Sequence, residues 1–420
     1  MVIIFVEHIT NRVEYTFDFI FGQREIQYRL TSDVDIFNAD SRARLNYSNR
    51  KFDVPTIPPS TLLFEEDYSS VPEKISDGLL EYLSFGGTKD IVASIFYVLT
   101  RMEEYTCSEF DVHGRFPFGR SILSSYDWVE RAVCDRWAVH LIVHQLQLDL
   151  KIKTGDIIPT FDIDNTYAYR LKSRKRMVLS FCRDLLRRNM DGIKERLKVK
   201  NGAKDPYDTY DRIRDIARRF PRTKLFWLTR SNGAKDRNVS IKNKAHCNLI
   251  QGLSESIEVN IHPSYGSFGS IQSIQEELQD LEAITKNKIQ SSRQHYLRFQ
   301  LPESYQQLIA LNIKNEHSMG FAEAIGFRSG TARAHFWFDL KNNRVAPLKI
   351  HPFVYMDGSL LEYQNCSIKG AKQKIKQLYL EVMEYGGDFR FIWHNETIGD
   401  FGIWKGWSEV LDFTLMLENE

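Results

Sequence analysis

Two carboxylates in the segment Thr160-Phe-Asp-Ile-Asp-Asn165 are the residues best placed to carry chemistry. They end an apolar run that is typical of a buried strand, and side chains two residues apart on a strand share one face. Asp162 and Asp164 would therefore project together from the C-terminal end of that strand. Carboxylates this close need a shared proton or a cation between them. The pair indicates a general base beside a metal ligand; the alternative is a solvated loop whose Asp residues cap the backbone.

Three histidines stand in comparable positions, at or near the ends of later apolar runs: His262, His295 and His394. Neutral imidazole is a common ligand for zinc-like metals, and a carboxylate with histidines from neighbouring strands is an ordinary metal site. One such histidine alone would more often be structural. Three of them, together with Asp164, indicate a metal centre.

The elements that would position these residues begin near Ile157. From there, short apolar runs alternate with longer helical segments, which indicates βα units and a mainly parallel sheet. The seven runs cover residues 157–164, 224–230, 257–262, 295–301, 318–321, 345–356 and 389–394. An open doubly wound sheet would fit this order, but polar residues at so many strand ends favour a barrel, whose active site collects there. Earlier in the chain, residues 14–21 alternate polar and apolar and residues 91–105 and 128–148 have helical spacing, as in an α+β domain.

The order of the motifs resembles that of the polysaccharide deacetylases, a carbohydrate esterase family whose catalytic domain is a distorted (β/α)7 barrel. The resemblance covers residues 157–420. It implies an α/β fold with such a barrel at 153–420, preceded by a smaller α+β domain of unknown function at 1–152. The segments 326–331 and Met356-Asp357 are similar to those of a divergent bacterial branch that carries an N-terminal domain of this kind.

The resemblance implies a role for each motif residue. Asp162 corresponds to the family's catalytic base and Asp164 to its metal-binding acid. His262 corresponds to the first histidine of a His-x-x-x-His metal motif. Arg293 corresponds to the Arg of an Arg-x-Pro-aromatic motif and would hold the base, whereas His394 would be the catalytic acid.

The chain departs from the family pattern at two positions. Gly266 stands where the second metal histidine would be, and His295 takes the place of Pro in the Arg-x-Pro-aromatic motif. Because a catalytic zinc needs about three protein ligands, we expect Asp164, His262 and His295 to hold a divalent cation, with Zn²⁺ as the expected ion. The candidates for binding the substrate are Tyr265, Tyr296, Arg328, Asn165 and Asn395.

These assignments imply metal-dependent hydrolysis of an N-acetyl group on a sugar or glycan intermediate. The metal would activate a water molecule, Asp162 would take its proton, and His394 would protonate the departing amine. The alternative from another class is a non-catalytic carbohydrate-binding barrel that has lost its metal site. An enzyme acting on a phosphate ester or a nucleic acid has only one basic segment of the chain in its favour.

That basic segment, residues 170–204, departs from an otherwise balanced composition. The whole chain has 56 Lys and Arg against 55 Asp and Glu, and the net charge of +1 indicates no general affinity for nucleic acid. Residues 170–204 contain thirteen Lys or Arg and three acids, interleaved with apolar residues. Such a segment is typical of contact with an anionic membrane surface or a phosphate-bearing substrate, although a solvated outer helix of the barrel is the simpler interpretation.

The expected location follows from two further features. The apolar start of the chain, residues 1–6, is too short for a signal peptide or a membrane span. Five cysteines without metal-binding spacing fit a reducing compartment. We therefore expect a cytoplasmic protein that acts on an acetylated sugar, either carried by a nucleotide or part of a lipid-linked glycan at the inner membrane face.

Overall fold

The computed structural model describes residues 1–420 apart from 79, 187, 232 and 420. Its N-terminal part holds a parallel sheet in the order β2-β1-β3 and an antiparallel sheet in the order β4-β5-β6. The strands are β1 (Val2–Val6), β2 (Tyr28–Thr31), β3 (Ala43–Tyr47), β4 (Glu73–Asp77), β5 (Leu80–Phe85) and β6 (Thr88–Lys89). The helices are α1 (Asn11–Ile20), α2 (Val34–Ala39), α3 (Ile91–Leu99), α4 (Met102–Tyr105), α5 (Ile122–Ser125) and α6 (Val133–Val139).

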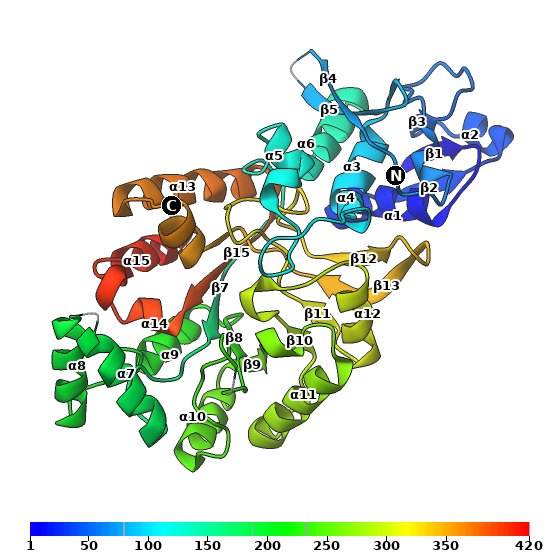
Figure 1. The fold of residues 1–420 in the computed structure, drawn as a ribbon. Coiled ribbons are helices and arrows are strands. Elements are labelled where there is room, and N and C mark those ends of the chain that lie inside the picture. Colours follow the sequence, from blue (N-terminus) through cyan, green and yellow to red (C-terminus); the bar gives the residue numbers. More distant parts are fainter. Residues whose placement is uncertain (79, 187, 232, 420) are drawn as a thin grey trace.

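The second part of the chain is built on a nine-stranded sheet in the order β12-β13-β11-β10-β9-β8-β7-β15-β14 (Figure 1). Neighbouring strands are parallel except for β12 and β13. The strands are β7 (Thr154–Ile163), β8 (Lys224–Trp227), β9 (Glu258–Ile261), β10 (Ser291–Ser292), β11 (Asn315–Glu316), β12 (His335–Asp339), β13 (Arg344–Ile350), β14 (Tyr355–Met356) and β15 (Gly387–His394). The helices are α7 (Arg174–Leu186), α8 (Met190–Lys200), α9 (Tyr210–Arg219), α10 (Lys244–Ser254), α11 (Ile271–Thr285), α12 (Glu303–Ala310), α13 (Ile368–Tyr385), α14 (Asn395–Ile398) and α15 (Ser408–Met416).

The sheet is the part of the fold that positions the strand-end residues. In β7 the residues from Ile157 to Ile163 are buried, and in β15 those from Phe389 to Trp393 are buried. Continuous burial of this kind is typical of parallel strands that helices cover on both faces. Within the described residues, strand pairing does not join the two edge strands, β12 and β14, to each other. The mixed α/β class and the mainly parallel sheet are thus confirmed, whereas the closed (β/α)7 barrel is not.

The fourth and fifth strands are shorter, and start earlier, than the apolar runs predicted. β10 ends at Ser292, and the run 295–301 begins with a 3-10 turn, His295–Leu297. Tyr296 and Leu297 have φ angles of +62° and +52°, which an extended strand does not contain. The chain therefore turns His295 across the end of the sheet instead of continuing along it.

The alternating residues near the N-terminus form a helix and not a strand. Residues 14–21 lie mostly in α1, whose first turn is capped by the Thr10 side chain accepting a hydrogen bond from the Val13 N–H. α1 contacts α3, α6 and β13, and residues around most of its circumference are buried. The helical spacing at 91–105 and 128–148 is confirmed in part, because helices cover much of both segments.

The loop 326–331 forms hydrogen bonds both to the N-terminal part and to a residue beside the nine-stranded sheet. The Gly326 N–H donates a hydrogen bond to the Val354 carbonyl, and the Phe327 N–H donates one to the Val129 carbonyl, both at 2.7 Å. Gly326 has a φ of +116°, and a Cβ atom on it would lie 2.1 Å from the Val129 carbonyl oxygen. Only glycine fits here. The proposed domain boundary at residue 152 remains a prediction, since the two parts are in contact along this loop.

Replacing Gly326 with Ala is expected to destabilise the protein by about 3 kcal/mol or more, because it combines an unfavourable φ with an overlap against backbone. Thermal or urea unfolding measures this loss. Gly252→Ala is the matched control: Gly252 lies within α10, and a Cβ there would meet nothing within 4 Å. Alanine is the better helix former, so this variant should be as stable as the parent or more so. Equal stability of the two variants would contradict the structural role of Gly326.

Candidate active site

The carboxyl ends of β7, β9, β10, β14 and β15 meet at one pocket of about 240 Å³. β7 and β15 bring Asp162, Asp164 and His394 to it, and the segments after β9 and β10 bring His262 and His295. The fold thus places together five residues that lie up to 232 positions apart in the sequence.

Asp164, His262 and His295 form a compact cluster of possible metal ligands. One donor atom from each of them lies within 4.8 Å of the other two. The Nε2 atom of His262 is 3.2 Å from Asp164 Oδ1, and the Nε2 atom of His295 is 3.3 Å from Asp164 Oδ2. The predicted ligand set is therefore brought together, although its role as a ligand set stays a prediction.

The orientation of both imidazoles leaves their Nε2 atoms for a cation. His262 Nδ1 donates a hydrogen bond to the Arg293 carbonyl at 2.6 Å, and His295 Nδ1 donates one to Asp236 Oδ1 at 3.0 Å. With Nδ1 protonated in each ring, the neutral form carries its lone pair on Nε2. The buried Oδ1 atom of Asp164 has no hydrogen-bond partner among the described residues. Two lone pairs and a carboxylate oxygen without a hydrogen bond thus converge, a set that fits a divalent metal.

The charge state of His295 reflects the same convergence. Burial opposes the imidazolium form, but Asp164 and Asp236 outweigh it and raise the pKa of His295 to about 9. Burial likewise opposes the charged form of Asp164, and the two histidines nevertheless hold its pKa well below the usual value. A proton or a metal ion on Nε2 would satisfy the same negative site, so the two compete.

Asp162 is held by a buried arginine. Arg293 Nη1 lies 2.7 Å from Asp162 Oδ1, Nη2 donates to Thr160 Oγ1 at 2.9 Å, and Nε donates to the His317 carbonyl at 3.0 Å. The guanidinium also lies 4.1 Å from the centre of the Phe226 ring. Because one oxygen of Asp162 is fixed in this way, its other oxygen is directed towards the pocket, where it can accept a proton.

His394 is the counterpart on the other side of the pocket. Its Nδ1 donates to Asp357 Oδ1 at 2.7 Å, and its Nε2 lies 3.9 Å from Asp164 Oδ2. Asp357 also accepts from the His394 N–H at 2.9 Å and from Thr397 Oγ1 at 2.6 Å. Burial opposes the imidazolium form, but Asp357 dominates and raises the pKa of His394 well above its usual value. A protonated ring in this position can act as a general acid.

The residues predicted to bind substrate are not all at the pocket. Tyr296 lines it, and Tyr265 packs behind it with its ring centre 5.4 Å from that of Tyr296. Asn395 does not line the pocket; its side-chain amide donates to the Asn165 carbonyl at 3.0 Å. Arg328 is a clearer correction, as Glu104 and the Gly320 carbonyl bind it in the interior at 2.7 and 3.0 Å. Arg328 therefore joins the two parts of the chain.

Sequence reasoning missed four acidic residues around the pocket. Asp236, in the loop after β8, holds His295 and accepts from the N–H groups of Tyr265 and Gly266. Asp357, Glu362 and Glu396 line the pocket itself. Burial, followed by the charge of Asp164, raises the pKa of Glu396 to about 7. Asp357 and Glu396 could have been found, because one lies in the Met356-Asp357 segment and the other two residues after His394.

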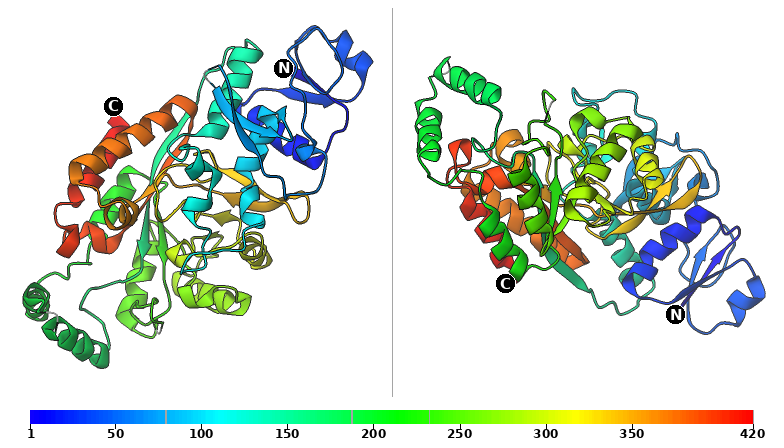
Figure 2. Two further views of the ribbon diagram at one scale, coloured as in Figure 1. Left: turned by 45° about the horizontal axis from the view of Figure 1, so that its top comes forward. Right: turned by 90° about the horizontal axis from the view of Figure 1, so that it is seen from below.

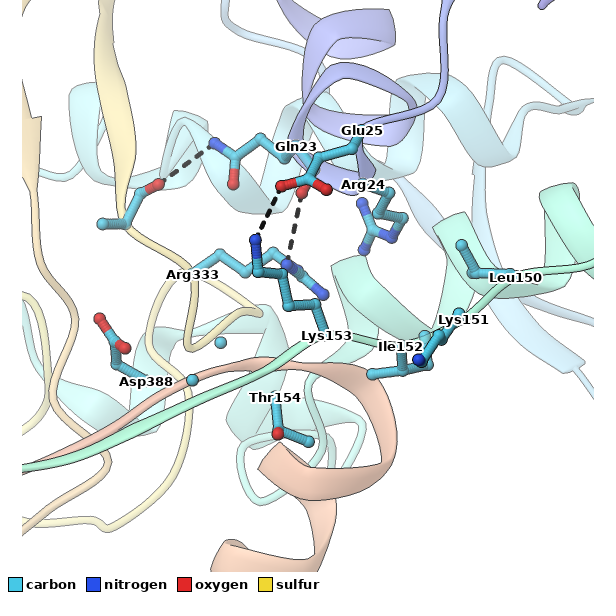
Figure 3. Close-up of a pocket in the computed structure, with 13 residues that line it drawn as sticks. Gln23, Arg24, Glu25, Leu150, Lys151, Ile152, Lys153, Thr154, Arg333 and Asp388 are labelled. Atoms are coloured by element: carbon cyan, nitrogen blue, oxygen red, sulfur yellow. Dashed lines mark hydrogen bonds and ion pairs between the residues drawn. The ribbon is translucent and has the colours of Figure 1, made fainter.

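Another pocket of about 250 Å³ lies at the opposite ends of the same strands (Figure 3). Thr154 and Asp388, at the starts of β7 and β15, line it together with Arg333 and the ion pair between Lys153 and Glu25, 2.9 Å apart. It lacks a cluster of metal ligands among the described residues. Among the described residues, the cluster of possible metal ligands thus lies at the carboxyl ends of the strands.

Comparison with known proteins gives limited similarity. Residues 2–148 match a family of unknown function, DUF7033. Among solved structures, a Mycobacterium smegmatis protein provisionally described as a polysaccharide deacetylase is 10% identical, with a TM-score of 0.38 over 64% of this chain and 90% of that one. The Xyl-CE4 domain of a multidomain xylanase from the hindgut metagenome of Trinervitermes trinervoides is 12% identical, with a TM-score of 0.27 over 64% and 83% of the respective chains. No curated protein matches the sequence significantly.

The ligand set can be tested by zinc titration against a competing chelator. His295→Ala is expected to lower the affinity for zinc by one to two orders of magnitude, and Asp236→Ala by about tenfold, because it releases the His295 ring. His144→Ala, a histidine outside the cluster, is the control and should bind zinc like the parent. Circular dichroism would verify that each variant is folded. Unchanged zinc affinity in both His295→Ala and Asp164→Ala would contradict a metal site here.

Proposed function

We propose that the protein is a metal-dependent hydrolase that removes an N-acetyl group from a sugar or glycan intermediate, with zinc as the metal. The observation that carries the proposal is the arrangement of one pocket. A cluster of three possible ligands, Asp164, His262 and His295, lies between an arginine-held carboxylate and a carboxylate-held imidazole. A base, a metal and an acid in this order fit the hydrolysis of an amide bond.

Asp164, His262 and His295 would hold the cation, which when bound would polarise the acetyl carbonyl and lower the pKa of a water molecule towards about 7. The free oxygen of Asp162 accepts the proton of the attacking water, and Arg293, bound to the other oxygen, keeps the carboxylate in place.

The oxyanion and the leaving group are served by other groups of the chain. The Tyr296 N–H makes no hydrogen bond to the backbone among the described residues, so it is available to an oxyanion. His394 donates its Nε2 proton to the departing amine, and Asp357 stabilises the imidazolium form beforehand. Aromatic side chains of Tyr296, Tyr363 and Trp404 line the pocket, where they can pack on a sugar ring.

The competing function is a carbohydrate-binding protein that has lost catalysis. Binding alone requires neither a base held by a buried arginine nor an acid held by a buried carboxylate. Burying Arg293 and Asp357 costs free energy that only their partners offset. The presence of both residues on either side of the ligand cluster therefore favours a catalytic function over carbohydrate binding alone.

The substrate we propose is an acetylated sugar on a nucleotide or in a lipid-linked glycan, met in the cytoplasm or at the inner membrane face. The membrane contact rests on the α7–α8 hairpin, which projects from the body of the molecule (Figure 2). Large apolar side chains are exposed on it, among them Val178, Leu179, Leu185 and Leu186. Exposed apolar residues beside cations fit an anionic lipid surface. No described helix is long and apolar enough to span a bilayer.

Asp162→Asn should lower kcat for acetate release from an N-acetylated sugar by about a thousandfold, since the amide cannot take the water proton. Asp357→Ala should lower kcat by about ten- to a hundredfold by freeing the His394 ring. Both variants should bind zinc as the parent does, which separates catalysis from metal loss. A parent protein that holds zinc yet releases no acetate from any acetylated sugar of a broad panel would refute the proposed function.

Leu185→Ser/Leu186→Ser should weaken binding to vesicles of anionic phospholipid by about tenfold or more, because two apolar side chains no longer enter the interface. Co-sedimentation measures this binding, which should also fall with rising salt. Leu380→Ser is the matched control, since Leu380 is 53% exposed on α13, outside the hairpin. Equal binding by the two variants, or no binding by the parent, would contradict the membrane contact.

A further inference from the structure

A large pocket with basic walls lies beside the catalytic pocket and has a volume of about 720 Å³. Helices α7 and α8 and the loop after β8 enclose it together with residues that follow β7. The acidic side chain in its lining is Asp184. Five basic side chains line it, and we call it the basic pocket: Lys172, Arg176, Arg183, Arg196 and Arg237.

The protein itself neutralises little of this positive charge. Within the described part of the chain, carboxylates form ion pairs with only two of the five cations, and both ion pairs use Asp184. Arg196 lies 2.8 Å from it and Arg183 lies 3.9 Å from it. Arg176 Nη1 and Arg237 Nε donate instead to main-chain carbonyls, at 3.2 and 2.7 Å. These cations therefore keep most of their capacity for an anion from outside the protein.

Two details indicate that the protein does not itself supply a counter-charge for these cations. The Nε atom of Arg196 is buried and has no hydrogen-bond partner among the described residues. Burial and then the charge of Arg176 lower the pKa of Lys172 to about 8. Both groups are costly to keep in this environment unless a counter-charge binds.

The basic pocket and the catalytic pocket share walls. Asn165, next to the ligand Asp164, lines the basic pocket, and so does Tyr207. The charge of Glu396, which lines the catalytic pocket, acts on the Tyr207 hydroxyl and, after burial, raises its pKa. Gly233, Ala234 and Arg237 line the basic pocket, and Asp236 of the same loop orients the His295 ring in the catalytic pocket. A substrate seated in the catalytic pocket can therefore extend towards the basic pocket.

We propose that the basic pocket binds the diphosphate group of the substrate, so that the enzyme acts on an acetylated sugar joined through a diphosphate to its carrier. This inference rests on the proposed deacetylase function. Guanidinium groups match phosphate oxygens with paired donors. A diphosphate diester brings two negative charges and several acceptor oxygens to these five cations, whereas a carboxylate brings one charge and two oxygens. A nucleoside diphosphate sugar and a lipid diphosphate sugar both present this group.

The subsite itself is tested with inorganic pyrophosphate as the probe, by calorimetric titration of the full chain. The parent should bind it, and Arg176→Gln/Arg237→Gln should bind it at least about tenfold more weakly, since each guanidinium supplies a charge-assisted hydrogen bond. Arg174→Gln/Lys194→Gln is the matched control: the two residues lie on α7 and α8, carry the same charge and do not line the pocket. Titrations before and after chelation of metal separate this binding from binding at a metal ion.

The outcomes of that titration are decisive. Weakened binding in the pocket variant but not in the control supports the subsite. No binding by the parent, or the same loss in both double variants, overturns it, because the effect would then be absent or a matter of overall charge. This result does not depend on turnover, so the subsite and the deacetylase activity can fail separately.

Turnover then identifies the carrier. For the parent, kcat/KM should be at least tenfold higher for an N-acetylated sugar diphosphate than for the same sugar without phosphate, and in Arg176→Gln/Arg237→Gln this ratio should fall towards one. A nucleoside diphosphate sugar in solution and a polyprenyl diphosphate sugar in vesicles are the two arms, and the better substrate names the carrier. An active enzyme with no preference for either diphosphate would overturn the inference while leaving the deacetylase function intact.

Discussion

The candidate site depends on a single buried guanidinium. Arg293 follows β10, and its side chain reaches two residues of β7, Thr160 and Asp162, as well as the His317 carbonyl beyond β11. Its own carbonyl accepts the hydrogen bond that sets the ring of His262 after β9. Burial lowers the pKa of Arg293, and Asp162 counters that effect. One charged group thus fixes the ends of four strands, and each partner is needed because the charge is fully enclosed.

The three histidines of the pocket are held by one common arrangement. In each, Nδ1 donates to an oxygen of the protein, which is a carbonyl for His262 and a carboxylate for His295 and His394. Nε2 is left for the pocket in all three. Main-chain N–H groups hold both carboxylates in turn: those of Tyr265 and Gly266 donate to Asp236, and those of His394 and Gly358 donate to Asp357. The same imidazole group can therefore serve as a ligand at one place and as an acid at another, according to what its second nitrogen faces.

The sequence allowed the strand-end residues to be predicted better than the elements that carry them. Asp162, Asp164 and His262 lie in or directly after apolar runs that do form strands, so their spacing predicts that they share one end of the sheet. A motif predicts His295, whereas the run that contains it begins with a turn that has positive φ angles. Asp236 could not be found, because it lies in a loop without periodicity and acts only through a residue 59 positions away. Strand closure, which decides between an open sheet and a barrel, depends on long-range pairing that local spacing does not encode.

Polar contacts join the N-terminal part of the chain to the strands and helices of the nine-stranded sheet. The loop at Gly326 is one such contact. A second is Glu381 of α13, which accepts hydrogen bonds from the Ala132 N–H at 2.8 Å and from Nε and Nη2 of Arg136. The Tyr15 hydroxyl on α1 donates to a carbonyl of β12 at 2.7 Å. Cutting the chain at the junction would leave charged groups without partners in the newly exposed surface. We therefore expect either part expressed alone to be less stable than it is within the full chain, because these contacts would be exchanged for water.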